Sequence, residues 1–360
     1  MSLTKVAIIG CGGIANGKHM PSLKKTGMCE MVAFCDLIKE RAEKAAADYG
    51  VKGAKVYTDY KKLLADPSIE VVHVCTPNRS HSKITVDALN AGKHVMCEKP
   101  MAINYKEAMK MVEAAKANNK LLTIGYQQRN RPDTAYLKAE CEKGTLGEIY
   151  FAKARSVRRR GVPTWGVFLN EYEQGGGALI DIGTHALDMC MWLMQDWDVN
   201  YVVGTSYTKH NKDTETANLF GDWDVNQFTA DDASFGFIVM KSGATIFLEA
   251  TWALNTLDLA EAKVELCGTN AGADMVDGLR INGVKNNRQY IETPDFSTGG
   301  VAFFEGNQGG SPADIEQVIW MNAVNGKGKL SVLPEQAAVV TRCLDAVYES
   351  AKTGKPVYFK

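Results

Sequence analysis

Two polar side chains in the middle of the chain have the spacing needed for acid–base chemistry. Asp181 and His185 follow the triple glycine 175–177, and a helix that starts near Gly177 puts both on one face. A histidine titrates near neutral pH, so His185 can take a proton from an alcohol and return it. Asp181 can fix the tautomer of that histidine or bind another hydroxyl group of a substrate. The alternative is a buried helix whose polar pair is satisfied internally.

Lys99 is a third candidate for catalysis. The motif Glu98-Lys99-Pro100 follows the apolar run His94–Cys97, which predicts a buried strand. A lysine at the mouth of a parallel sheet can hydrogen-bond a substrate hydroxyl group and stabilise a developing alkoxide. The proline fixes the turn that aims the lysine. The alternative is an ordinary surface ion pair between the neighbouring glutamate and lysine.

A glycine-rich segment near the start of the chain is typical of dinucleotide binding. Gly10 permits a tight turn after the apolar run 6–9, and Gly12 lets the backbone approach a pyrophosphate. The small Ala15 allows close packing of the next helix, whose free N–H groups point at the phosphates. The predicted binding segment comprises Gly10, Gly12, Gly13, Ile14 and Ala15. A glycine turn with a purely structural role is the alternative.

Asp36 ends a second apolar run, 31–35, about 20 residues beyond the glycine segment. An acid at this place can accept both hydroxyl groups of a ribose. It favours NAD over NADP, because the 2′-phosphate of NADP would meet a carboxylate. Lys39 and Arg41 lie close enough in the sequence to keep NADP open.

The segment after the apolar run Val71–Cys75 is a further candidate for cofactor contact. Its proline-ordered turn leads into a predicted helix N-terminus, which suits the phosphates or the nicotinamide side of the cofactor. The residues concerned are Thr76, Pro77, Asn78 and His81, with Glu98 and Lys99 of the later loop. The alternative is a capped loop with a solvated His81.

Two arginines and a tryptophan in the second half are candidates for substrate contact. Strand-like alternation puts Arg158 and Arg160 on one face, where they can grip an anionic or polyhydroxylated substrate. They can equally form salt bridges between subunits. Trp165 lies on a loop rich in Pro and Gly, where it can stack on a sugar ring or fill the seam between domains.

Two kinds of element must position these residues. In the first third, apolar runs alternate with helical patterns, which predicts a doubly wound parallel sheet of the α/β class. The predicted strands are Val6–Ile9, Val32–Cys35, Val71–Cys75, His94–Cys97 and Leu121–Ile124, and the helices Ala42–Tyr49, Ser82–Ala91 and Lys106–Asn118. Ligands bind beyond the carboxyl ends of such strands, where the loops described above begin.

The pattern changes after Tyr126, where a helix Thr134–Lys143 precedes longer alternating runs typical of antiparallel strands. These runs are Ile149–Val157, Tyr201–Tyr207, Ala233–Met240, Thr245–Trp252 and Lys263–Leu266. The segment 282–310 is weakly patterned and predicts an irregular excursion. A last helix is expected over about 334–352. We therefore predict a dinucleotide-binding domain at 1–126 and a substrate-binding and oligomerisation domain at 127–360.

Composition narrows the possible partners. A chain of 360 residues is longer than one core usually supports. A net charge of −1 gives no electrostatic reason to expect nucleic acid or an anionic membrane, and no apolar run is long enough to span a bilayer. No secretory signal is visible. The nine scattered cysteines show no metal or disulfide spacing, so we expect no metal site and a cytoplasmic location.

Together these motifs resemble the Gfo/Idh/MocA family of oxidoreductases, and the likeness covers nearly the whole chain. The resemblance implies an N-terminal Rossmann domain and a C-terminal α/β domain with a large, open, mostly antiparallel sheet. It also implies homodimers or homotetramers built through that sheet. The matching lysine, aspartate and histidine line the substrate site in such proteins, and here they are Lys99, Asp181 and His185. Gln127 falls in the segment that often closes over the nicotinamide, and Ala15 replaces the third glycine.

The leading hypothesis is an NAD(P)-dependent dehydrogenase of a secondary alcohol in a sugar, cyclitol or glycoside. His185 would remove the hydroxyl proton, Lys99 would stabilise the oxygen, and Asp181 would orient the histidine or the substrate. A second hypothesis is a glycoside hydrolase or lyase that retains NAD and oxidises its substrate transiently. A third is a non-catalytic regulator that binds a nucleotide or sugar.

Overall fold

The computed structural model describes residues 3–296 and 310–360. These residues form two compact units. The first contains residues 3–130 and 310–338, and the second contains residues 131–296 and 339–360.

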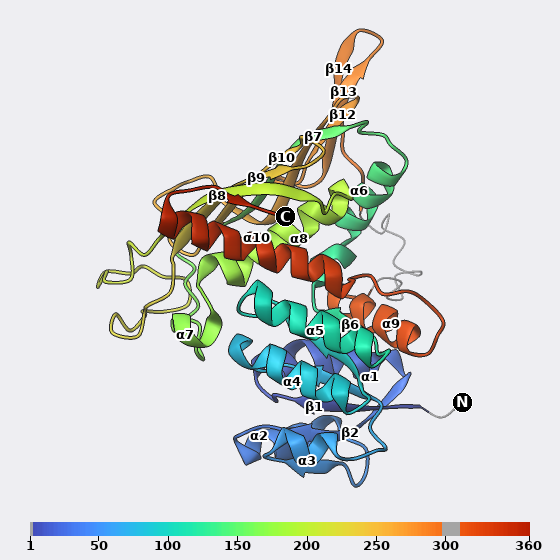
Figure 1. The fold of residues 1–360 in the computed structure, drawn as a ribbon. Helices are drawn as coiled ribbons and strands as arrows, with labels where there is room; N and C mark the ends of the chain where they lie inside the picture. The colour runs from blue at the N-terminus through green and yellow to red at the C-terminus, as the bar shows by residue number, and fades with distance from the viewer. Residues whose placement is uncertain (1–2, 297–309) are drawn as a thin grey trace. The chain divides into compact units, whose positions relative to one another are not determined.

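The first unit is built on a parallel sheet in the order β3-β2-β1-β4-β5-β6, with helices along it (Figure 1). Its strands are β1 (Thr4–Ile9), β2 (Cys29–Cys35), β3 (Lys55–Tyr57), β4 (Val71–Val74), β5 (His94–Cys97) and β6 (Leu122–Ile124). Its helices are η1 (Ala15–His19), α1 (Met20–Thr26), α2 (Lys39–Tyr49), α3 (Tyr60–Leu64), α4 (Asn78–Asn90), α5 (Tyr105–Ala117), η2 (Gln127–Asn130) and α9 (Pro312–Val324). The doubly wound parallel fold expected for this region is confirmed. The strand order reverses between β1 and β4, and ligands bind at such a switch point.

Burial explains which of these elements are visible in the sequence. The central strands β1 and β4 are almost entirely buried on both faces and therefore appear as unbroken apolar runs. The edge strand β3 and the short helix α3 were not predicted. β3 has three residues, none of them buried, so it carries no apolar signal.

The second unit contains a sheet in the order β14-β13-β12-β11-β7-β10-β9-β8-β15. Its strands are β7 (Ile149–Val157), β8 (Val199–Tyr207), β9 (Ala233–Met240), β10 (Thr245–Thr251), β11 (Ala260–Gly268), β12 (Ala271–Asp274), β13 (Arg280–Lys285), β14 (Arg288–Glu292) and β15 (Val357–Tyr358). Its helices are α6 (Pro132–Glu142), α7 (Glu171–Gln174), η3 (Leu179–Gly183) and α8 (Thr184–Met194). The long α10 (Pro334–Thr353) begins in the first unit and continues in the second. The mostly antiparallel sheet is confirmed, although β7 and β10 pair in parallel.

The expected irregular excursion over 282–310 is wrong in its first part. β13 and β14 form an antiparallel hairpin whose turn residues Asn286 and Asn287 have φ of 50° and 58°. Asparagine tolerates this left-handed region, and a two-residue hairpin turn of type I′ needs it at both central positions. The Asn-Asn pair was therefore a turn signal. Residues 297–309 lie outside the described residues.

In the described part of the chain, no helix is both long and apolar enough to cross a membrane. All nine cysteines lie within the described residues, and every thiol is unpaired.

Candidate functional site

The glycine segment and the loop after β4 approach each other at the carboxyl ends of their strands. Gly10 has φ of 90°, and a Cβ built on it would lie 2.5 Å from the carbonyl oxygen of Cys75 and 3.0 Å from the amide nitrogen of Thr76. No larger residue fits there. A Cβ on Gly12 or Gly13, by contrast, would meet nothing within 4 Å. Space for a pyrophosphate therefore lies beside the start of the first helix, as dinucleotide binding requires.

Asp36 is tied to the glycine segment by its carboxylate. Oδ2 accepts a hydrogen bond of 2.9 Å from the backbone N–H of Cys11, and Oδ1 accepts one of 2.9 Å from that of Ile38. Each carboxylate oxygen has a second lone pair, which can accept a ribose hydroxyl group. Of the two basic residues that kept NADP open, Lys39 pairs with Glu43 at 2.7 Å. This arrangement fits NAD.

His81 is buried and clamps two loops, so the solvated His81 of the alternative is wrong. Its Nδ1 lies 2.8 Å from the carbonyl oxygen of Pro100, and its Nε2 lies 2.8 Å from that of Thr76. Burial lowers the pKa of His81, while the two carbonyl groups oppose that shift. Pro77 precedes α4, which begins at Asn78. The imidazole therefore joins the loop after β4 to the loop after β5, which carries Lys99.

Glu98 is buried behind the lysine of its motif and does not form the surface ion pair considered from the sequence. Its Oε2 accepts a hydrogen bond of 3.0 Å from the backbone N–H of Lys99, and its Oε1 lies 2.7 Å from Nζ of Lys18. Burial alone would raise the pKa of Glu98, but Lys18 and His19 hold it well below its usual range. Glu98 thus acts on the backbone of Lys99, while Lys99 itself is half-buried.

Ile14 and Gln127 differ in what they offer a ligand. Ile14 is 42% exposed at the start of the first helix. The side-chain oxygen of Gln127, in η2, is buried and has no hydrogen-bond partner within residues 3–296 and 310–360. A buried acceptor without a donor costs about 1–3 kcal/mol, so a donor from outside these residues fits there.

In the second unit, Asp231 holds the triple glycine in place. Its carboxylate accepts hydrogen bonds from the backbone N–H groups of Gly177 (2.5 Å) and Leu179 (3.1 Å). The hydroxyl groups of Tyr348 (2.7 Å) and Ser234 (3.0 Å) also donate to it. A carboxylate beside free N–H groups stabilises a helix N-terminus. Asp231 was not predicted, because its partners lie far away in the sequence.

The glycines are needed because distant segments of the same chain approach them closely. A Cβ on Gly176 would collide with the hydroxyl group of Tyr348, and one on Gly177 with the backbone of Asp231. The helix that follows begins at Ala178, close to the predicted start.

Asp181 and His185 do not lie on one regular α-helix, as the sequence predicted. Asp181 belongs to the π-helical turn η3, and His185 lies in the first turn of α8. π-helical turns are rare and occur often at functional sites. Asp181 is buried, and its Oδ2 accepts a hydrogen bond of 3.0 Å from the indole N–H of Trp252. This bond fixes the carboxylate, while His185 stays half-buried.

The candidate arginines bind within their own chain. Arg158 makes two hydrogen bonds to the carboxylate of Glu261, of 2.7 and 2.6 Å. Arg160 donates to the carbonyl oxygen of Arg159 (2.7 Å) and to the side-chain oxygen of Asn255 (2.8 Å). The alternation that put them on one face does not extend this far, because β7 ends at Val157. Burial lowers the pKa of Arg158, but Glu261 and then Asp181 raise it.

Trp165 is 53% exposed at the end of an aromatic cluster. Its ring meets Phe220 and Phe168 edge to face, with centroids 5.0 and 5.7 Å apart. Phe168 in turn contacts Trp252, which holds Asp181. The structure thus links Trp165 through two aromatic rings to Asp181.

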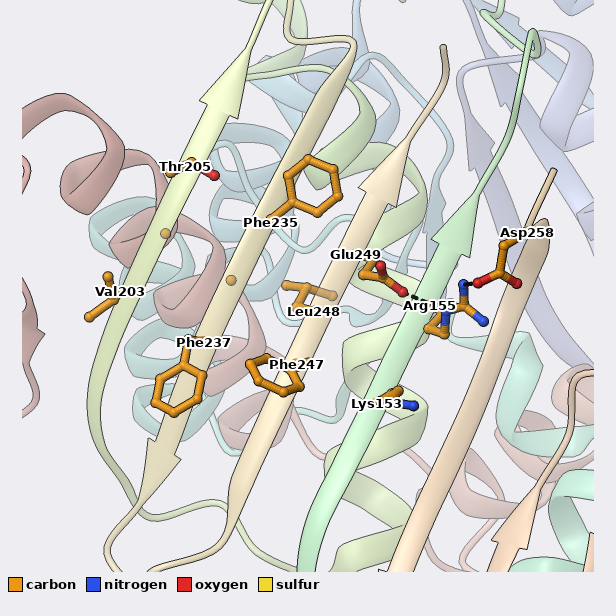
Figure 2. A pocket seen from close by; sticks show the side chains of 12 residues that line it. Lys153, Arg155, Val203, Thr205, Phe235, Phe237, Phe247, Leu248, Glu249 and Asp258 are labelled. Carbon is orange, nitrogen blue, oxygen red and sulfur yellow. Dashed lines mark hydrogen bonds and ion pairs between the residues drawn. The ribbon is translucent and has the colours of Figure 1, made fainter. Parts of the chain in front are cut away.

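A hollow of about 480 Å³ lies on the other face of the second sheet (Figure 2). Gly204 and Gly236 form part of its lining, and a Cβ on either would meet Val347 of α10 on the opposite face. Phe237 and Phe247 stand beside them with ring centroids 5.2 Å apart. Arg155, paired with Glu249 (2.5 Å) and Asp258 (2.6 Å), closes one side. Since η3 packs on the helical face, where Gly183 meets Ala250, this hollow is separate from Asp181.

Comparisons with known proteins give two matching regions along the chain. Residues 4–126 match the family model "Oxidoreductase family, NAD-binding Rossmann fold", and residues 138–359 match "Oxidoreductase family, C-terminal alpha/beta domain". D-glucoside 3-dehydrogenase of Escherichia coli is 35% identical over 98% of this chain and 97% of its own length. Inositol 2-dehydrogenase/D-chiro-inositol 3-dehydrogenase of Lactiplantibacillus plantarum is 31% identical over 58% of this chain and 57% of its own. A structure of levoglucosan dehydrogenase with NADH and levoglucosan has a TM-score of 0.83 at 23% identity and covers 99% of both chains.

Proposed function

Because this chain belongs to the Gfo/Idh/MocA family of NAD-binding oxidoreductases, we propose that it oxidises or reduces a secondary alcohol of a sugar, cyclitol or glycoside. The named activities of the similar proteins, on D-glucosides, inositols and levoglucosan, all concern polyhydroxylated rings. We further propose that residues 1–126 hold the dinucleotide and that residues 127–360 bind the substrate and the partner subunits.

The arrangement at the carboxyl ends of β1, β2 and β4 carries the proposal. Gly10 fits against Cys75, open space adjoins Gly12, and the carboxylate of Asp36 is fixed on the glycine segment. These features fit the ribose and pyrophosphate of NAD, with Thr76 and Asn78 on the neighbouring loop. When bound, the cofactor supplies a nicotinamide ring that accepts or donates a hydride.

The proposed chemistry divides the work among three side chains. His185 takes the proton of the substrate hydroxyl group, and its half-buried position leaves the ring partly accessible. Lys99 hydrogen-bonds the substrate oxygen as negative charge develops on it. Asp181, already fixed by Trp252, orients the histidine or a neighbouring hydroxyl group. In the same proposal, Trp165 and the two arginines Arg158 and Arg160 contribute to substrate binding.

A spectrophotometric screen tests this function. The full-length protein is incubated with NAD⁺ or NADP⁺ and a panel of glucosides, inositols and anhydrosugars, and reduced nicotinamide is followed by absorbance. Lys99→Met and His185→Ala should each lower kcat by about 10²–10⁴-fold while the Kd for NAD stays the same. Lys143→Met, which removes an exposed lysine paired with Glu140, is the matched control. Full turnover in either active-site variant would remove that residue from the mechanism.

We propose a homodimer or homotetramer built through the second sheet, and a cytoplasmic location, which the unpaired cysteines support. The sheet face around the hollow exposes Phe247 (41%), Tyr207 (39%) and Val203 (37%), and large exposed apolar patches favour association. Sedimentation velocity should give at least twice the chain mass of 39.3 kDa. Phe247→Asp should shift the protein toward monomer, and Val318→Asp, at a similarly exposed position of α9, should not. A monomeric wild type would contradict the proposal.

A further inference from the structure

Four buried side chains, those of Trp320, His73, His19 and Glu98, form a row of hydrogen bonds behind the loop of Lys99. This row has no part in the chemistry proposed above. The indole N–H of Trp320 donates to Nε2 of His73 at 3.2 Å. Nδ1 of His73 lies 2.9 Å from Nδ1 of His19, and Nε2 of His19 lies 2.7 Å from Oε1 of Glu98. None of the four is more than 4% exposed. We call these residues the relay.

The chemistry of its two ends gives the relay a single direction. An indole nitrogen can only donate, so Nε2 of His73 must accept and carries no proton. The neutral ring of His73 then has its proton on Nδ1 and donates to His19. His19 accepts at Nδ1, carries its own proton on Nε2, and donates to the carboxylate of Glu98. Any other neutral tautomer sets two N–H groups or two lone pairs against each other at 2.9 Å or less.

The charges around the two imidazoles would otherwise attract a proton. Nζ of Lys18 lies 2.7 Å from Glu98 and 3.0 Å from Glu316, so one ammonium faces two carboxyl groups. With both glutamates ionised the formal charge is −1. The neighbouring thiols of Cys75 and Cys97 stay protonated, because burial raises their pKa. Burial also lowers the pKa of both imidazoles, which favours the neutral rings.

We propose that the indole N–H of Trp320 locks this relay: by occupying Nε2 of His73 it fixes both tautomers, excludes a proton from the pair, and orients Glu98. A proton added at Nδ1 of His19 would face the N–H of His73, which cannot turn its proton to Nε2 while Trp320 donates there. Glu98 passes the orientation on, because its other oxygen accepts from the backbone N–H of Lys99 at 3.0 Å. Trp320, His73 and His19 are therefore positioning residues, and their effect on turnover rests on the proposed role of Lys99.

Imidazole nitrogen spectra of the full-length protein labelled with ¹⁵N-histidine test the lock directly. In the wild type, His73 should carry its proton on Nδ1 and His19 on Nε2, with both rings neutral from pH 8 to below pH 6. This measurement needs no variant. A proton on Nε2 of His73, or a charged ring in either residue at pH 7, would overturn the proposal.

Trp320→Phe keeps the apolar packing and removes the N–H. The midpoint at which the pair takes up a proton should rise by about one pH unit, the size expected for one hydrogen bond. Trp223→Phe is the matched control, because its buried indole nitrogen has no partner in the described part of the chain. A midpoint unchanged in Trp320→Phe, or shifted equally in Trp223→Phe, would overturn the lock.

The pH profile of kcat separates the lock from the proposed function. Trp320→Phe should gain an inflection on the acid side that the wild type lacks. If the nitrogen spectra change as expected and the profile does not, the coupling of the relay to Lys99 is refuted. If Lys99→Met retains full turnover, Lys99 has no part in the mechanism and the relay has no effect on turnover through it, while the spectra still decide on the lock. If no substrate of the panel is turned over by the wild type, the proposed function fails and the spectra again decide on the lock.

Discussion

Replacing Asp231 by asparagine should unfold the second unit more easily and disable the helix that carries Asp181 and His185. The carboxylate accepts four hydrogen bonds, two of them from the backbone N–H groups of Gly177 and Leu179. Asparagine has almost the same shape but only one oxygen. Its NH₂ group must therefore face a donor, and at least one buried N–H loses its acceptor.

The size of the effect follows from these contacts. A hydrogen bond to a charged group contributes about 1.5–3 kcal/mol, and a buried donor left without a partner costs about 1–3 kcal/mol. The favourable interaction with the helix N-terminus adds about 0.3–1 kcal/mol. We expect a loss near 3 kcal/mol, which lowers the Tm of a unit of this size by about 6–12 °C. Ser234→Ala removes one hydrogen bond to the same carboxylate but leaves both backbone N–H groups paired, so it should cost about 1.5 kcal/mol and lower the Tm by about 3–6 °C.

Tryptophan fluorescence is a suitable assay, because Trp320 is the sole tryptophan of the first unit and the other five of the six belong to the second. Thermal melts of the Asp231→Asn variant, of Ser234→Ala and of the wild type are compared at one pH. The Kd for NAD should stay within a factor of two of the wild-type value, since the cofactor residues lie in the first unit. A Tm for Asp231→Asn no lower than that of Ser234→Ala would refute the reasoning.

Three further perturbations follow from the first unit. Asp36→Ala should weaken NAD binding by about 10- to 100-fold, as expected for lost bonds to a charged acceptor, and leave NADP binding nearly unchanged; calorimetric titration measures both. Gly10→Ala should abolish NAD binding and lower the Tm, because its Cβ meets the loop after β4. Gly13→Ala should leave the Tm within about 3 °C of the wild type, since its Cβ enters open space. Equal melting temperatures for these two variants would contradict the packing argument. Stability should fall with acid: the unfolded chain protonates His19 and His73 near pH 6.5, whereas burial lowers the pKa of both in the folded state. The unfolded state then binds more protons, so the free energy of unfolding should drop by up to about 1.4 kcal/mol per imidazole for each pH unit below 6.5, measured by urea titration.

The sequence alone determined the features that depend on near neighbours. The buried strands β1, β4 and β5 appear as apolar runs because a parallel sheet covered on both faces admits few polar side chains. Gly10 and Asp36 were recognisable because a dinucleotide requires a tight turn and an acid at a fixed separation. β7 and β9 were predicted with their observed bounds, since alternation persists along the whole of each strand.

Only the tertiary structure decided which groups these elements meet. Gly177 is held by Asp231, 54 residues away, and Arg158 is paired with Glu261, 103 residues away. Spacing along the chain carries no record of such partners, so neither the anchoring Asp231 nor the pairing of Arg158 with Glu261 could be predicted from the sequence. The π-helical turn at Asp181 and the relay that ends on Trp320 could not be predicted from the sequence for the same reason. Hydrogen bonds fix their geometry, and a hydrogen bond depends on distance in space, whereas periodicity in a sequence reports mainly which side chains avoid water.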